Sequence, residues 1–157
     1  MPCRASLLAL CAVAPLALAL PPSAPKYVLH VIVDDLGWGD VSWHKTSSSE
    51  VQTPHTQALV DEGTLLTRFH VHKMCTPSRS AFMSGRLPMH VQQGLPNPED
   101  SNCGVPFNMT GLGIKMKEGG YQTSWVGKWD LGMATTRHTP RGRGFDQSLI
   151  YYEHKND

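Results

Sequence analysis

The sequence has little of what marks several common classes of protein. Its formal net charge is only +1, with 14 Lys and Arg against 13 Asp and Glu, and no run of like charges stands out. Proteins that bind nucleic acid or an anionic membrane surface usually carry a basic patch, so the composition predicts neither partner. No internal repeat or low-complexity tract is visible. The 157 residues, 40% hydrophobic, are enough for one modest domain with a core.

The N-terminus has the three parts of a secretory signal peptide. Residues 1–4 are short and basic, residues 5–20 are almost wholly apolar, and small residues follow. We expect a signal peptide at 1–24, cleaved at about 19–24, and a protein of the secretory pathway, extracellular or lysosomal. A membrane anchor is the alternative, but the run is short for a span and Pro15 interrupts it. The sequon at Asn108 predicts N-glycosylation, which fits a secreted loop.

Cysteine is scarce, and the eight histidines show no zinc spacing such as His-Glu-x-x-His. Loss of the signal peptide removes Cys3 and Cys11 and leaves Cys75 and Cys103. Two cysteines in an oxidising compartment normally predict one disulfide. If Cys75 instead has a chemical role, Cys103 has no partner within this chain.

The order of the predicted elements favours an α/β fold. Strands are expected at 26–33, 64–71 and 121–126, with a further candidate at 148–152, and helices at 53–63, 77–84 and 110–118. Residues 86–109 are expected to form an irregular connection. Strands that alternate with helices predict a mostly parallel sheet flanked by helices.

Polar residues follow three of these strands, namely Asp34-Asp35, Cys75 and Gly127-Lys128. Ligands gather at the carboxyl ends of the strands in such sheets, so we expect these groups at one edge of the sheet. This convergence predicts a functional site.

Cys75 is expected to lie just before a helix. Thr76 suits the N-cap, Pro77 suits the first helical position, and Arg79 lies one turn further on. A helix N-terminus and a guanidinium together favour an anion such as sulfate or phosphate. The alternative is a buried structural cysteine before an ordinary helix.

Asp34 and Asp35 are hard oxygen ligands and predict a Ca²⁺ or Mg²⁺ site, with a solvated turn as the alternative. Lys128, between Gly127 and Trp129, could contact an anionic substrate or lie on the surface. Asp130 could accept a proton or neutralise Lys128.

Several segments together resemble the sulfatase family. The segment Cys75-Thr76-Pro77-Ser78-Arg79-Ser80 is similar to the motif whose cysteine is converted to formylglycine. Four more segments resemble family motifs and occur in family order, at 34–40, 53–63, 120–129 and 143–146. The closest similarity is to arylsulfatases, within the alkaline phosphatase superfamily. The resemblance therefore implies an alkaline-phosphatase-like α/β fold.

The resemblance also implies a role for each site residue. A formylglycine-generating enzyme would convert Cys75 to an aldehyde, whose hydrate attacks the sulfur of a sulfate ester. Asp34, Asp35 and the modified Cys75 would bind Ca²⁺, with Mg²⁺ as second choice. Arg79 would hold the hydrate and Lys128 the sulfate group of a small-molecule or saccharide ester.

Two departures from the family qualify this interpretation. Asp130 stands where many sulfatases have histidine, and an aspartate can accept a proton but cannot offer a positive charge. The chain also lacks the later metal-binding, histidine and lysine motifs, so we expect residues 26–157 to be the N-terminal part of a catalytic domain. The alternatives are a phosphoesterase or phosphonate hydrolase of the same superfamily and a non-catalytic secreted product; oligomeric state stays open.

Overall fold

The computed structural model describes residues 27–44, 50–92 and 99–153. The chain divides into two units, residues 1–33 and 34–157. The predicted signal peptide at 1–24, with Cys3 and Cys11, lies outside the described residues. Within the described ranges, no helix is long and apolar enough to cross a membrane.

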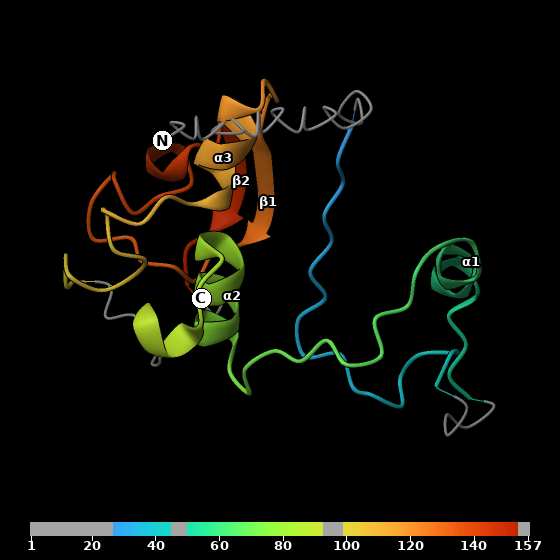
Figure 1. The fold of residues 1–157 in the computed structure, drawn as a ribbon. Helices are drawn as coiled ribbons and strands as arrows, with labels where there is room; N and C mark the ends of the chain where they lie inside the picture. The colour runs from blue at the N-terminus through green and yellow to red at the C-terminus, as the bar shows by residue number, and fades with distance from the viewer. Residues whose placement is uncertain (1–26, 45–49, 93–98, 154–157) are drawn as a thin grey trace, which may run out of the picture. The chain divides into compact units, whose positions relative to one another are not determined.

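Three α-helices form close to where the sequence predicts them. They are α1 (Pro54–Glu62), α2 (Cys75–Ser84) and α3 (Leu112–Glu118) (Figure 1). Pro54 opens α1, where its missing N–H has no helical partner to lose. Gly85 ends α2 with a φ of 67°, a left-handed conformation that glycine adopts without steric cost.

The start of α2 corrects one prediction. Met74 is the N-cap residue, so Cys75 is the first residue of the helix and Thr76 is not its cap. The Thr76 side chain is fully buried, and its hydroxyl has no hydrogen-bond partner among the described residues. Cys75 therefore lies in the first turn, where backbone N–H groups have no helical acceptor.

A small parallel sheet pairs β1 (Ser124–Lys128) with β2 (Gln147–Tyr151) (Figure 1). Lys128 lies opposite Tyr151 at the carboxyl end of the pair. Backbone hydrogen bonds continue past the strands, since the Asp130 N–H donates to the Tyr152 carbonyl at 2.8 Å. The predicted strand at 121–126 is thus displaced toward Lys128, and that at 148–152 is displaced by one residue.

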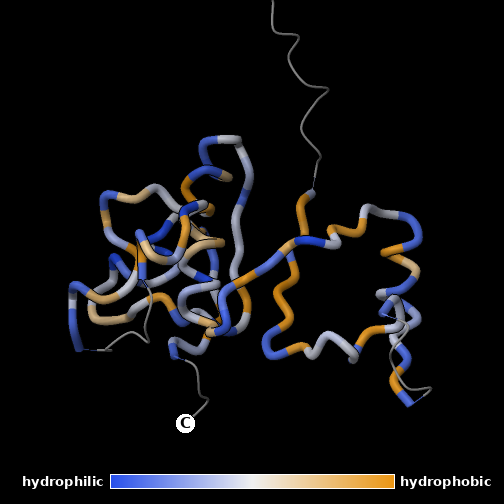
Figure 2. The backbone as a smooth tube through the Cα atoms, turned by 60° about the horizontal axis from the view of Figure 1, so that its bottom comes forward, coloured by the Kyte–Doolittle hydropathy of each residue, from blue (hydrophilic) through white to orange (hydrophobic). Residues whose placement is uncertain are grey.

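The strands predicted at 26–33 and 64–71 are wrong for the residues that the structure describes. Residues 27–33 and 64–71 carry no strand, and most of their large apolar side chains are exposed. Figure 2 colours the backbone by residue hydropathy and shows hydrophobic residues along open, extended stretches of the chain. A strand needs a ladder of backbone hydrogen bonds to a neighbour, and the sheet that the described residues form contains only β1 and β2. The fold is therefore α/β with a small sheet in place of the predicted larger one.

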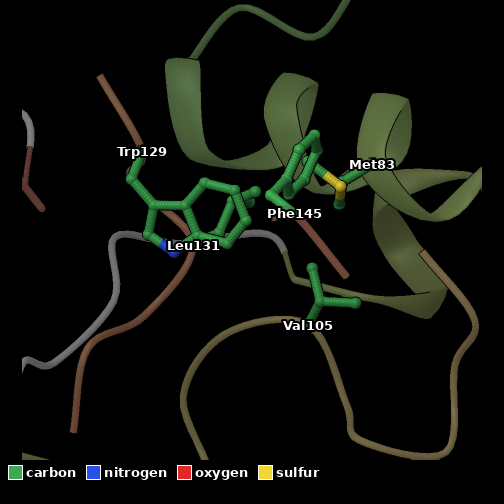
Figure 3. Packing of buried hydrophobic residues seen from close by; sticks show 5 residues of the cluster. All are labelled: Met83, Val105, Trp129, Leu131 and Phe145. Atoms are coloured by element: carbon green, nitrogen blue, oxygen red, sulfur yellow. The ribbon is translucent and has the colours of Figure 1, made fainter. Parts of the chain in front are cut away.

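The buried core packs α2 against the segments that follow β1 and precede β2. Its members are Met83, Val105, Trp129, Leu131 and Phe145 (Figure 3). Trp125 contacts both Trp129 and Phe145 edge to face, with 5.4 Å between ring centroids in each pair. Such aromatic pairs contribute about 0.5–1.5 kcal/mol beyond their buried area. The core thus fixes the end of β1 beside α2.

Asp146 joins the starts of the two strands. Its carboxylate accepts hydrogen bonds from the Thr123 N–H at 2.9 Å and the Thr123 hydroxyl at 3.1 Å, and pairs with Lys117 of α3 at 2.7 Å. The Thr123 carbonyl accepts the Asp146 N–H in return at 2.9 Å. The hydrogen bond from Lys117, then that from the Thr123 N–H, lowers the pKa of Asp146 to about 2.

We predict that Asp146→Ala lowers the free energy of unfolding at neutral pH. Because the folded pKa of Asp146 lies below its ordinary value of 3.8, the carboxylate stabilises the fold above that value. This stabilisation is lost as the pH falls through about 2. Urea unfolding of both proteins between pH 2 and 7 should show the difference shrinking toward acid. A difference that does not change with pH would contradict this assignment.

Candidate active site

Arg79 ties α2 to the end of β1. Its side chain is almost fully buried, and Nη1 donates to the Lys128 carbonyl at 2.7 Å. Nη2 lies 3.3 Å from Asp34 Oδ2 and forms an ion pair with it. The Trp125 indole N–H donates to the same Lys128 carbonyl at 3.2 Å. The backbone at the end of β1 is therefore held from two directions.

Lys128 also points its side chain into this group. It is 8% exposed, and its Nζ lies 2.8 Å from Asp34 Oδ2. One carboxylate oxygen of Asp34 thus accepts from both buried cations. Burial lowers the pKa of Lys128, but hydrogen bonds to Asp34 and Cys75 outweigh this and raise the pKa. The pKa of Asp34 is lowered, first by the hydrogen bond from Lys128, so the pair is charged at neutral pH.

Cys75 lies beside these charges. The Cys75 side chain is close enough to contribute to the raised pKa of Lys128, and Cys75 is a half-buried free thiol. Arg79 lies one turn further along the same helix. A group bound next to Cys75 would meet a helix N-terminus and two cations, which suits an anion with several oxygens.

Asp130 also lies near the Lys128 ammonium. Its side chain is fully buried, and Oδ2 is 3.8 Å from Lys128 Nζ. Its φ of 57° is in the left-handed region, which aspartate tolerates better than most residues. Lys128 therefore lies within ion-pair distance of two carboxylates.

The structure brings Asp34, Cys75, Arg79, Lys128 and Asp130 together, but not along one wide sheet edge. The end of β1 supplies only Lys128 and Asp130, whereas a loop supplies Asp34 and a helix supplies Cys75. Sequence reasoning missed that the Lys128 carbonyl is an acceptor and that the Trp125 indole donates to it. In the sequence, the contact corresponds only to the three-residue spacing of Trp125 and Lys128.

The other predicted residues lie outside this group. Asp35 is exposed, with a left-handed φ of 54°. Asn108 is exposed in a turn that the Met109 N–H closes on the Pro106 carbonyl at 3.0 Å. Cys103 is a free thiol whose Sγ lies 3.6 Å from Asp100 Oδ2.

The donors fit the predicted Ca²⁺ in kind but not in number. Ca²⁺ takes about six to eight oxygen ligands. Asp34 and Asp35 offer hard carboxylates, but Asp34 already accepts from two cations. Among residues 27–44, 50–92 and 99–153, no three or more His, Cys, Asp or Glu side chains come together as a metal site. These residues therefore do not by themselves make a calcium centre.

We predict that Arg79→Lys lowers the free energy of unfolding by about 1–3 kcal/mol, because it removes the planar fork that reaches both the Lys128 carbonyl and Asp34. Arg86→Lys is the matched control, since Arg86 is exposed and bonds the nearby Ser84 carbonyl at 2.9 Å. Urea unfolding should separate the two variants. Equal effects would contradict the bridging role of Arg79.

Comparison with known proteins shows the family of the chain. The sulfatase family matches residues 26–157. Arylsulfatase J of Mus musculus is 38% identical over 141 residues, which cover 84% of this chain and 23% of that protein. N-acetylgalactosamine-6-sulfatase of Canis lupus familiaris is 34% identical over 133 residues, or 78% of this chain and 25% of that protein.

A solved structure is also similar to this chain. The crystal structure of Ps i-CgsB is 36% identical, with a TM-score of 0.68 over 76% of this chain and 26% of that one. The chain thus spans about a quarter of the length of the proteins it matches. The family match covers the whole of the gathered site, from Asp34 to Asp130, and the chain belongs to the sulfatase family.

Proposed function

We propose that the protein hydrolyses sulfuric esters through a formylglycine made from Cys75. The observation that carries the proposal is the position of Cys75 at the start of α2, beside the buried Lys128 and one turn from the buried Arg79. Membership of the sulfatase family supports the reaction class. A hydrated aldehyde at this position supplies two hydroxyls, one to attack sulfur and one to release the sulfate.

The residues of this chain bind and orient the reacting groups. The Cys75 sulfur marks the place of the formylglycine oxygens, so the Lys128 ammonium would donate to an oxygen at that atom. Arg79 fixes the backbone of Lys128 and places a second positive charge in the site. Cys75 is the first residue of α2, and the backbone N–H groups at a helix N-terminus favour the oxygens of a sulfate group. Burial strengthens each of these interactions because water screens them little.

Ca²⁺ stays an expectation from the family resemblance. Asp34, Asp35 and the modified Cys75 would supply ligands, and the remaining ligands would come from outside the described residues. The ion would polarise the sulfate oxygens. No step above depends on it.

The substrate is proposed only as a sulfate ester, either a small molecule or a saccharide. The names of two relatives, arylsulfatase J and N-acetylgalactosamine-6-sulfatase, refer to different kinds of substrate and so leave both classes open. We further propose a protein of the secretory pathway, extracellular or lysosomal. The signal-like N-terminus and the exposed sequon at Asn108 support this location.

We predict that the protein, expressed from its complete gene in a eukaryotic host with a formylglycine-generating enzyme, hydrolyses an aryl sulfate far faster than an aryl phosphate. Cys75→Ser should reduce aryl sulfate turnover to background, because the formylglycine-generating enzyme converts a cysteine and not a serine. Mass spectrometry of the same sample should show an aldehyde or its hydrate at Cys75 and a glycan at Asn108.

Cys103→Ser is the control for loss of a thiol and should keep its activity. An intact Cys75 thiol in active protein would contradict the formylglycine route. Preference for the phosphate ester would instead favour the phosphoesterase alternative. An unmodified Asn108 would remove the support for the secretory location at that site.

A further inference from the structure

Ion pairs link four charged side chains of the candidate site, two positive and two negative. Arg79 and Lys128 are positive, whereas Asp34 and Asp130 are negative. The side chains of Arg79, Lys128 and Asp130 are 7%, 8% and 0% exposed, so solvent and salt screen them little. Removing the charge of Asp130 would leave this buried group with a net charge of +1.

The position of Asp130 is fixed by the fold. Its N–H donates to the Tyr152 carbonyl at 2.8 Å, and its neighbours Trp129 and Leu131 are both buried in the core. The side chain therefore cannot swing into solvent and leave the lysine. The Asp130 carboxylate is therefore held beside the Lys128 ammonium.

Field strength matters because the candidate esters differ in charge. A sulfate monoester carries one negative charge, whereas a phosphate monoester carries about −1.5 to −2 at pH 7. A fixed negative charge nearby therefore weakens the binding of the phosphate ester more than that of the sulfate ester.

We propose that Asp130 is a specificity-determining residue, whose buried charge beside Lys128 selects singly charged sulfate esters over doubly charged phosphate esters. The inference rests on the proposed function for its substrate class. It does not depend on a metal ion, because any bound cation adds the same charge with and without Asp130. The residue acts through the field and through Lys128, and no direct contact with the ester is required.

The test compares the binding of two probes, 4-nitrophenyl sulfate and 4-nitrophenyl phosphate. Binding is measured by calorimetry on the complete protein carrying Cys75→Ala, which prevents turnover. We expect Asp130→Asn to shift the ratio of the two dissociation constants by about tenfold toward the phosphate ester. Asparagine has the same shape and also tolerates a left-handed φ, so the fold should be kept.

Two further variants make the result interpretable. Asp61→Asn removes the same charge from an exposed side chain of α1 and should leave the ratio unchanged, because water screens that charge. Asp130→Gly is a second neutral variant, in case Asn does not fold, since glycine accepts a φ of 57°. Circular dichroism checks the fold of each protein.

The outcomes separate this inference from the proposed function. An unchanged ratio in folded Asp130→Asn and Asp130→Gly, a shift toward sulfate, or an equal shift in Asp61→Asn would overturn the role of Asp130. Failure of the Cys75→Ala protein to bind either ester would also overturn it. A shifted binding ratio together with no hydrolysis by the unsubstituted protein would support the inference and reject the proposed sulfatase activity.

Discussion

A single carboxylate oxygen holds the candidate site together. Asp34 Oδ2 accepts from Lys128 at 2.8 Å and from Arg79 at 3.3 Å, so it joins a loop, the end of β1 and helix α2. Two cations buried side by side would repel each other and lose hydration without such a partner. The other features of the site depend on this shared contact, including the position of the Lys128 ammonium beside Cys75.

The aromatic core makes that contact possible. Trp129 directly follows Lys128 and is fully buried, and its packing against Phe145 and Trp125 fixes where β1 ends. Trp125 also donates to the Lys128 carbonyl, the same atom that Arg79 binds. Hydrophobic packing thus sets the backbone, and the charged network then orients the side chains. Because the buried neighbours Trp129 and Leu131 fix the backbone at position 130, Asp130 stays beside the lysine.

The helices and the residues of the site followed from local sequence signals, whereas the wider sheet did not. Pro54 and Gly85 mark helix ends through their own backbone preferences, so a single sequence reveals them. The apolar runs at 27–33 and 64–71 suit strands, but a strand also requires a partner, which no local pattern specifies. The same limit applies to Asp34, whose spacing predicted a metal ligand. Its contact with Lys128, 94 residues away in sequence, is visible only in the fold.

A double-mutant cycle between Asp34→Asn and Lys128→Met tests the central claim most directly. The free energy of unfolding is measured for the two single variants, the double variant and the unsubstituted protein. If the shared carboxylate organises the site, the two substitutions should be non-additive by about 1–3 kcal/mol, because the second removes a charge that the first has already left without its counter-ion. Additivity within about 0.5 kcal/mol would contradict the account.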